Sequence, residues 1–440
     1  LEDSVIGKLL NRLLSMDTKE IYGTLENNSL GISDTKELFT LEEAMAAMFA
    51  GNAVLFVDGY DRAIKIGSKG YPGSGVQKTD SEKGLRGSKE AFSESVKMNT
   101  ALIRKRIRNA KMKAEEKQVG RYSATTTALL YLDGVVYLPI CEEMRKRLNA
   151  FEVDGIEDGG MIEYLTRKKK EGRFPVYQTT ERPDRAAQAI LEGRVVLLTD
   201  NSPEALIFPA TLNSLFQTAD DYYRNERIVT FLRLIRYVAA FLALALPGLY
   251  VAAATFHPQL LPGNLIRSMA EARSGVPFPT AAEVLLMELS FELLREAGLR
   301  MPGPAGNTIG IVGGLIVGQA AVSANLVSPI TVTVAALTAL GSFSIPNEEL
   351  SEVFRLWKYG ILLLGSCFGI LGVMLGCFLL LMLMAEQESY GIPWLYPYVG
   401  GNLNERADEK DSMFLAAARK RKRRPIFAKW GNRIRFRRKS

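Results

Sequence analysis

The sequence predicts an α/β cytosolic N-terminal domain, expected to contain two related subdomains, followed by an all-α polytopic membrane domain. Residues 1–231 carry 33 Lys/Arg and 34 Asp/Glu, whereas residues 232–384 carry only eight of each among long apolar runs. The last run, from Gly360 to Met384, contains no charged residue. About 20 apolar residues cross a bilayer as a helix, so membrane spans are expected after a soluble half.

The two soluble subdomains are predicted from a repeated pattern. Leu41–Asp58 reads LEEAMAAMFAGNAVLFVD, and Pro183–Asp200 reads PDRAAQAILEGRVVLLTD, so that Gly51 matches Gly193. Each pattern is typical of an amphipathic helix, a glycine at the helix end and a β-branched strand that closes in aspartate. Duplication explains the match, and chance is the alternative because helix–glycine–strand is common in α/β proteins. The subdomains are placed at 1–120 and 121–231.

Three further segments of the soluble half have recognisable patterns. Phe92–Ile107 carries apolar residues on one helical face and basic residues on the others, which predicts a solvated or partner-facing helix. Tyr122–Leu138 is rich in Thr, Tyr and Val and predicts one or two strands. Gly67–Gly75 is glycine-rich but lacks the Lys-Ser/Thr ending of a phosphate loop, so a loop is expected there.

The membrane domain, residues 232–384, is predicted to contain about four full spans. These are Leu232–Phe256, Thr308–Val327, Pro329–Ile345 and Tyr359–Met384. Pro247 inside the first span predicts a kink or a break. Glycines at three- and four-residue spacing in the last span predict close helix packing, namely Gly365, Gly369, Gly372 and Gly376.

One predicted helix, Thr280–Gly298, is unusual because it holds several acids within the membrane domain. Charges facing lipid are costly, so this helix is expected to be interfacial, re-entrant or buried against other subunits. Glu283, Glu288 and Glu292 lie near one face and could line a cation path in an oligomer. The alternative is that they pair with Arg295 and Arg300, or face water.

Gln319 is the other candidate residue for an ion path or a subunit contact. It lies in the middle of the predicted span Thr308–Val327, where an amide must find a partner or a water path. An ordinary interhelical hydrogen bond is the alternative.

The basic tail, residues 385–440, holds 14 Lys/Arg and six Asp/Glu and accounts for the net charge of +7. A nucleic-acid-binding surface on the folded domain is therefore not expected. Basic residues before Leu232 and after Gly400 place both ends of the membrane domain in the cytosol, with the tail contacting anionic lipid. The chain opens at Leu1 without a signal peptide, so a fragment edge is expected there.

Catalytic chemistry is not predicted, and neither is a cofactor or a metal. The chain has one histidine, His257, so metal sites and histidine-based triads are nearly excluded. Cys367 and Cys377 are ten residues apart in one predicted helix, about 15 Å by helical rise, which is too far for a disulfide. Catalytic aspartates at strand ends or turns are a further possibility, but capping and turn roles explain them better; these are Asp58, Asp133 and Asp200.

Several stretches resemble the GerA family of bacterial spore germination proteins. In the soluble half they are Arg86-Gly-Ser-Lys-Glu-Ala-Phe92, Asn99-Thr-Ala-Leu-Ile-Arg104, Thr180-Glu-Arg-Pro-Asp184 and Leu191-Glu-Gly-Arg-Val195. In the membrane half they are Phe256-His-Pro258, Gly275-Val-Pro-Phe-Pro279, Phe291-Glu-Leu-Leu-Arg-Glu-Ala-Gly298, Ile316-Val-Gly-Gln-Ala-Ala321 and Phe343-Ser-Ile-Pro346. The ordered series covers roughly residues 40 to 384.

The resemblance implies the A subunit of a nutrient germinant receptor in the inner membrane of the spore. It also implies assembly with B- and C-type subunits, self-association and an oligomeric ion-conducting element. The motif residues that it implies to be structural are Arg86, Asn99, Arg104, Glu181, Arg182, Pro183, Asp184 and Pro346. One departure, Tyr71-Pro-Gly-Ser-Gly75, looks more like the SpoVAF-type branch of the family. A SpoVAF-type accessory protein, a secondary transporter and an enzyme-coupled membrane sensor stay open as alternatives.

Overall fold

The structure is a computed structural model, and the chain in it divides into two compact units. It describes residues 7, 11, 15–16, 35–49, 52–59, 61–66, 82, 87–168, 171–300, 314, 317–399, 410–429, 431 and 433–434. The α/β unit comprises Leu1–Lys168, Val176–Ala210 and Ala418–Ser440. The helical unit comprises Lys169–Pro175 and Thr211–Ala417.

The α/β unit contains a small three-stranded antiparallel sheet in the order β1-β3-β2. Its elements are β1 (Thr35–Leu38), α3 (Leu41–Phe49), β2 (Ala53–Leu55) and β3 (Ala63–Ile66). Leu38, Ala44, Ala47 and Ala63 are buried between the helix and the sheet, with Val54 packed against them. The apolar face of α3 therefore packs on this sheet and stabilises it.

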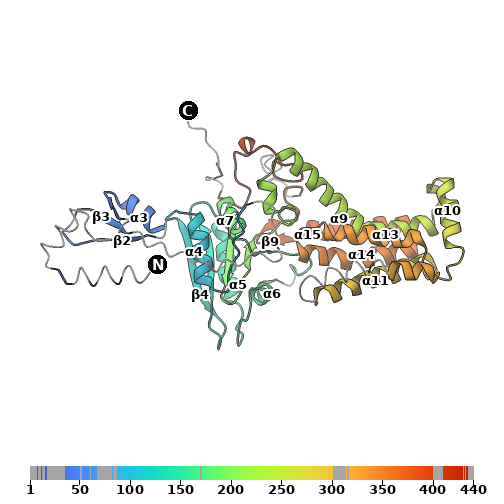
Figure 1. Cartoon of the computed structure of the whole chain (residues 1–440), viewed down its shortest axis with the longest axis horizontal. Helices are drawn as coiled ribbons and strands as arrows, with labels where there is room; N and C mark the ends of the chain where they lie inside the picture. Colours follow the sequence, from blue (N-terminus) through green and yellow to red (C-terminus); the bar gives the residue numbers. More distant parts are fainter. Residues whose placement is uncertain are drawn as a thin grey trace. The chain divides into compact units, whose positions relative to one another are not determined.

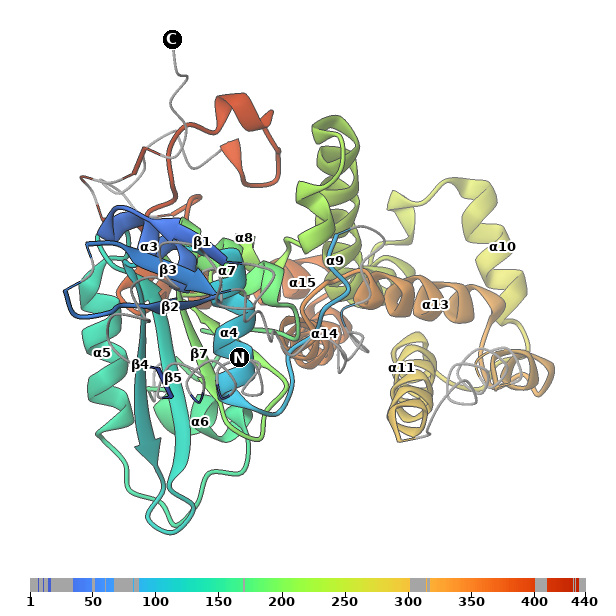
Figure 2. The ribbon, with the colours of Figure 1, turned by 60° about the vertical axis from the view of Figure 1, so that its left-hand side comes forward.

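A five-stranded antiparallel sheet forms the core of the α/β unit, in the order β4-β5-β7-β8-β6 (Figure 2). Its strands are β4 (Met112–Val119), β5 (Thr125–Leu132), β6 (Gln178–Thr180), β7 (Val195–Thr199) and β8 (Ala205–Phe208). The helices of this unit are α4 (Val96–Arg106), α5 (Leu138–Leu148), α6 (Gly159–Thr166) and α7 (Pro183–Glu192). Helices α4 and α7 cover one face of the sheet, and α5 approaches β4, where Arg145 contacts Glu115. Every residue of β7 is buried.

The same βαββ arrangement occurs twice in the α/β unit. In the first, β1-α3-β2-β3, strand β3 pairs with both β1 and β2; in the second, β6-α7-β7-β8, strand β8 pairs with both β6 and β7. Strand β3 begins at Ala63 and β8 at Ala205, which is the same offset as that from Gly51 to Gly193 in the repeated sequence pattern. The shared topology at the predicted offset is what duplication of this unit would produce.

The predicted boundary between residues 120 and 121 is wrong, because it falls in the turn between two paired strands. Residues of β4 and β5 pair without a gap from Met112 with Leu132 to Val119 with Thr125. The chain leaves the α/β unit after Ala210 rather than after residue 231. The segment after Ala210 packs instead with the helices that follow.

The described part of the helical unit is mainly helical, and several of its helices are long (Figure 1). They are α8 (Leu212–Leu215), η1 (Ala219–Tyr222), α9 (Glu226–Thr255), η2 (Pro258–Leu260), α10 (Gly263–Arg273), α11 (Thr280–Leu299), α13 (Pro329–Phe343), α14 (Glu348–Phe368) and α15 (Ile370–Glu386). Helix α9 packs against α13 and α14, and α14 packs against α15. A hairpin of β9 (Glu388–Ser389) and β10 (Ile392–Pro393) follows α15.

The predicted span Tyr359–Met384 is wrong, because the apolar run folds into two helices that meet at Gly369. This residue has φ +62° and ψ −142°, a conformation that only glycine adopts readily. A Cβ atom on Gly372 would collide with the carbonyl oxygen of Leu364, so α15 folds back tightly on α14. Glycine is tolerated inside membrane helices, so the sequence alone did not reveal the turn.

The expectation of about four full spans is also corrected for the part of the chain that the structure describes. Within it, α9 alone is long and apolar enough to cross a membrane, and α13 and α15 are shorter apolar helices. Pro247 does not end α9, which continues to Thr255. The predicted span Thr308–Val327 lies partly outside the described residues. Within the part of this span that is described, residues 317–323 are helical.

The predicted basic tail, residues 385–440, contains two segments whose apolar residues are buried in the folded units. In the helical unit, Trp394 is fully buried and its Nε1 donates to the carbonyl of Pro175 at 2.7 Å. In the α/β unit, Phe427 and Ala428 are buried, and Ala428 forms an antiparallel bridge with Val136. Residues after the last helix therefore belong to both folded units.

Candidate functional site

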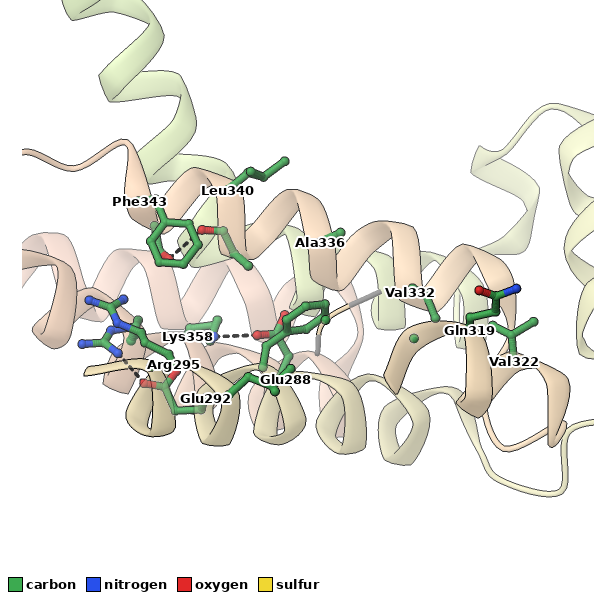
Figure 3. A pocket seen from close by; sticks show the side chains of 18 of the residues that line it. Glu288, Glu292, Arg295, Gln319, Val322, Val332, Ala336, Leu340, Phe343 and Lys358 are labelled. Carbon is green, nitrogen blue, oxygen red and sulfur yellow. Dashed lines mark hydrogen bonds and ion pairs between the residues drawn. The ribbon is translucent and has the colours of Figure 1, made fainter. Parts of the chain in front are cut away.

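A cavity of about 1160 Å³ lies among α11, α13, α14 and the helical residues 317–323 of the helical unit (Figure 3). One wall is apolar and comes mainly from α13, with Val332, Ala336 and Leu340 among its residues. The other wall is charged and carries Glu288, Glu292 and Arg295 of α11 with Glu348, Arg355 and Lys358 of α14. The cavity thus combines a charged wall with an apolar one.

The innermost ion pair of the charged wall joins Lys358 of α14 to Glu288 of α11. The Lys358 Nζ atom lies 2.6 Å from Glu288 Oε2, and the side chains are only 6% and 2% exposed. Lys358 Nζ also lies 4.9 Å from the centre of the Tyr359 ring. Taking both charges out of water is costly, so each is expected to depend on its partner.

Two further ion pairs continue from this pair toward the end of α14 that begins at Glu348. Arg355 pairs with Glu292 of α11, and its Nη2 lies 3.5 Å from Glu352 one turn earlier on α14. Arg295 Nη2 lies 3.4 Å from Glu348, whose side chain is 63% exposed. Ascending numbers on α11 meet descending numbers on α14, so the helices are antiparallel and the wall grades from exposed to buried. We call this series the α11–α14 ladder.

Several polar atoms of the α11–α14 ladder have no hydrogen-bond partner among the described residues. They are Glu288 Oε1, Arg295 Nη1 and Arg355 Nε, each of them buried. Buried polar atoms without partners are uncommon and costly in a folded protein. The ladder therefore has unused capacity for hydrogen bonds or charge beside the cavity.

Glu283 does not belong to the cavity, although the sequence grouped it with Glu288 and Glu292. It is fully buried, and its Oε1 accepts from Arg273 Nε at 3.1 Å. Its Oε2 accepts from the backbone N–H of Ser328 at 2.9 Å and from Thr331 Oγ1 at 3.1 Å. Glu283 thus fixes the start of α13 to α11.

The other sequence candidate, Gln319, lines the cavity together with Glu288 and Glu292. Figure 3 shows Gln319 and Val322 at the end of the cavity opposite Arg295. Its side chain is exposed. The structure therefore brings three of the four predicted residues to one cavity. Their base partners, Lys358 and Arg355, were missed by sequence reasoning because such pairs join residues far apart in the chain.

A second cluster of buried charges surrounds Arg233, near the beginning of α9. Arg233 Nε lies 3.0 Å from Asp221 Oδ2, and its Nη1 lies 3.0 Å from Asp411 Oδ1. Arg233 Nη1 also donates to the carbonyl of Ser412 at 2.6 Å. Arg236 donates to both carboxylate oxygens of Asp221, at 2.9 and 3.0 Å. We call these residues the Arg233 cluster.

Arg233 and Arg236, at the leading end of the predicted first span, are therefore paired within the fold. Burial alone would raise the pKa of Asp221, but the hydrogen bonds and charges of Arg236 and Arg233 outweigh it, so the pKa is lowered. The Arg233 cluster connects α9 with segments on both sides of it in the sequence. It is an anchor for the start of this helix.

In the α/β unit, two of the motif segments contact each other. The Phe92 N–H donates to the carbonyl of Glu181 at 2.8 Å. The buried Arg182 binds Asp184 at 2.8 Å and donates to the carbonyl of Ser88 at 3.3 Å. Pro183 occupies the first turn of α7, where its missing N–H is not needed. These residues join α7 to the segment before α4.

The remaining motif residues occupy different settings. The buried Asn99 accepts from the N–H of Ser93 at 2.8 Å and donates to its carbonyl at 2.6 Å. Arg104 and Pro346 are exposed, and Pro346 lies between α13 and α14. Arg86, Ile316 and the segments Gly67–Gly75 and Tyr71–Gly75 lie outside the described residues.

The described residues offer little for catalysis by a metal or a thiol. Within the described ranges, no group of three His, Cys, Asp or Glu side chains could hold a metal ion. Burial raises the pKa of the Cys141 thiol to about 12, so it is neutral at pH 7. The charged cavity of the helical unit is therefore the most developed candidate site.

Comparison with known proteins gives consistent matches over most of the chain. The family model described as "Bacillus/Clostridium GerA spore germination protein" matches residues 1–427. "Uncharacterized membrane protein YfkQ" of Bacillus subtilis (strain 168) is 37% identical over 390 residues, which are 89% of this chain and 75% of that protein. "Spore germination protein KA" of the same organism is 34% identical over 397 residues, covering 90% and 73% of the two chains.

Among solved structures, one match concerns an A subunit. It is the crystal structure of the N-terminal domain of the A subunit of the Bacillus megaterium spore germinant receptor GerK3. The two chains are 25% identical, with a TM-score of 0.33, over 46% of this chain and 72% of that one.

Proposed function

We propose, because this chain belongs to the GerA family of spore germination proteins, that it is the A subunit of a nutrient germinant receptor. The resemblance seen in the motifs is confirmed by the family match over residues 1–427 and by relatives named as spore germination proteins. The proposed role is non-enzymatic: the subunit responds to a nutrient signal and supplies part of an ion-conducting element.

The proposed location is the inner membrane of the spore. Helix α9 is long and apolar enough to span it, and one relative is named a membrane protein. Both termini and the α/β unit are cytosolic in this proposal, and the basic tail contacts membrane lipids. The A subunit self-associates and assembles with B- and C-type subunits, and it binds no nucleic acid.

The observation that supports ion conduction is the charged wall of the cavity in the helical unit. Ionisable residues inside a membrane domain usually mark an aqueous path or a subunit contact. The α11–α14 ladder brings Glu288 and Glu292 to a cavity of about 1160 Å³, which Gln319 also lines. Repeated around an oligomer axis, these carboxylates would select cations.

The proposal is tested in spores that lack this chain, and in spores that carry it with an affinity tag. With a nutrient mixture that triggers germination, the spores with the chain should release monovalent cations, and spores without it should release them at least tenfold more slowly. The tag should co-purify B- and C-type subunits encoded beside this chain. Equal release from both kinds of spore for every nutrient tried, with no co-purifying subunit, would contradict the proposal.

A further inference from the structure

The α11–α14 ladder contains more acids than bases around its two inner ion pairs. Lys358 and Arg355 of α14 are surrounded by Glu288 and Glu292 on α11 and by Glu352 on α14 itself. Arg355 already contacts two of these acids, Glu292 and Glu352. The two bases therefore have more than one way to be paired.

We propose that Lys358 is a gating residue that exchanges Glu288 for Glu292 when the receptor is activated. In the exchanged state Arg355 gives up Glu292 and keeps Glu352, so both bases stay paired. The carboxylate of Glu288 is then left free beside the cavity. This inference rests on the proposed function, because it concerns the control of the proposed ion path.

In this proposal the exchange needs rotation of side chains and no movement of the helices, because Glu288 and Glu292 are one helical turn apart on α11. Residues four apart on one helix face, such as Glu288 and Glu292, have Cβ atoms about 5–6 Å apart. The lysine side chain is a flexible four-carbon stem with a point charge, so its ammonium group can move between neighbouring turns. Helix α11 can stay in place, which suits Glu283, whose contacts with Ser328 and Thr331 hold it to α13.

Burial makes the exchange a choice between two states rather than a gradual shift. Lys358 is only 6% exposed, so an intermediate in which it has no carboxylate is costly. Arg355 can release Glu292 and still contact a carboxylate, because it already lies beside Glu352. The Glu352 side chain is 60% exposed, so this second pair contributes little to stability in either state. The resting arrangement of the ladder is therefore stabilised mainly by the pair of Lys358 and Glu288.

The exchange would turn a neutral wall into a cation site. At rest, Lys358 neutralises Glu288, whose second oxygen has no partner among the described residues. Without Lys358, the Glu288 carboxylate would be buried and uncompensated, a state that a permeating cation stabilises. The gate and the cation site are then the same residue pair.

Three substitutions distinguish the proposed gate from ion pairs that serve only stability, because one should speed cation release and the other two should slow it. Lys358→Met frees Glu288 permanently, so spores should release cations without nutrient. Glu292→Gln removes the second partner of Lys358, and Glu352→Gln removes that of Arg355, so both should slow nutrient-triggered release at least tenfold. If Lys358→Met slows release as the other two do, or if both glutamine variants respond at the normal rate, the proposed gate is wrong.

A second measurement does not depend on conduction. A hydrophobic carbodiimide, mapped by mass spectrometry on the full chain in membranes, should modify Glu288 in the Lys358→Met variant at least fivefold more than in the unaltered chain. Glu283, which keeps its partners, is the internal control and should stay unmodified in both. Equal modification of Glu288 in both chains overturns the gate. Increased modification without cation release supports the partner exchange and instead contradicts the proposed ion path.

Discussion

Arg233 and Lys358 are buried basic residues among the described part of the helical unit, and the fold holds them in different ways. Arg233 contacts Asp221, Asp411 and the carbonyl of Ser412, and it is 1% exposed. Lys358 has one carboxylate partner, Glu288, and both line a cavity. Charges with several fixed partners suit an anchor, whereas a charge with one partner and a second acid nearby suits a switch.

Replacement of Arg233 by Met should have the largest effect on stability. It breaks the pairs of Arg233 with Asp221 and with Asp411, although Asp221 keeps Arg236, and breaking a buried ion pair costs about 3–5 kcal/mol. We expect much lower abundance in membranes and a lower melting temperature of the detergent-solubilised chain. The exposed Arg227, also near the start of α9, is the matched control, and Arg227→Met should leave both quantities unchanged. Equal effects of the two substitutions would show that the Arg233 cluster is not an anchor.

Replacement of Lys358 by Met should destabilise the chain less, by about 3 kcal/mol, at the lower end of the range for a broken buried ion pair, since it removes one pair where Arg233→Met removes two. Adding Glu288→Leu should recover most of the lost stability, because a buried ion pair can often be replaced by apolar residues. The free energy of unfolding in detergent, measured for both variants, checks this. A double variant less stable than Lys358→Met alone would contradict the assignment of the pair.

The Arg233 cluster should also give the chain a distinct dependence on acid. The pKa of Asp221 is lowered in the folded chain, so the ionised carboxylate stabilises the fold at pH values above the unfolded pKa of about 3.9. This contribution is lost as the pH falls through the lower folded pKa. Tryptophan fluorescence between pH 5 and pH 2 should show a steeper loss of stability for the unaltered chain than for Asp221→Asn. The same slope in both would exclude Asp221 as a cause.

The smallest effect on stability is expected for Glu352→Gln. Its pair with Arg355 is largely exposed on the Glu352 side, and exposed ion pairs contribute less than about 1 kcal/mol. The melting temperature in detergent should change little. A large decrease would mean that slower germination of this variant reflects misfolding, and it would contradict the surface role given to the Glu352–Arg355 pair.

Local patterns in the sequence predicted local structure well. The helix expected at Thr280–Gly298 is observed at Thr280–Leu299, and α13 begins at the predicted Pro329. The offset between the two repeated sequence patterns recurs between β3 and β8. Each of these features depends on residues that are neighbours in the chain, so periodicity and composition carry the information.

Features that depend on distant residues were not predictable in the same way. Pairing with Arg295 and Arg300 was one alternative for Glu283, Glu288 and Glu292, but the bases that these three acids contact are Arg273, Lys358 and Arg355. Periodicity shows that an acid must be compensated and does not show which base will reach it. The turn at Gly369 was not predicted for a related reason. A glycine that allows a turn and a glycine that allows close helix packing have the same residue type and the same spacing in the sequence.

The most direct test of the account is cation flux through the purified chain in lipid vesicles, without spores or nutrient. Vesicles with the Lys358→Met chain should lose trapped potassium at least tenfold faster than vesicles with the unaltered chain. The Lys358→Met/Glu288→Gln chain should return the rate to that of the unaltered chain, because the free carboxylate is removed. If Lys358→Met vesicles leak no faster than unaltered ones, or the double variant leaks as fast as the single one, Lys358 and Glu288 do not control an ion path.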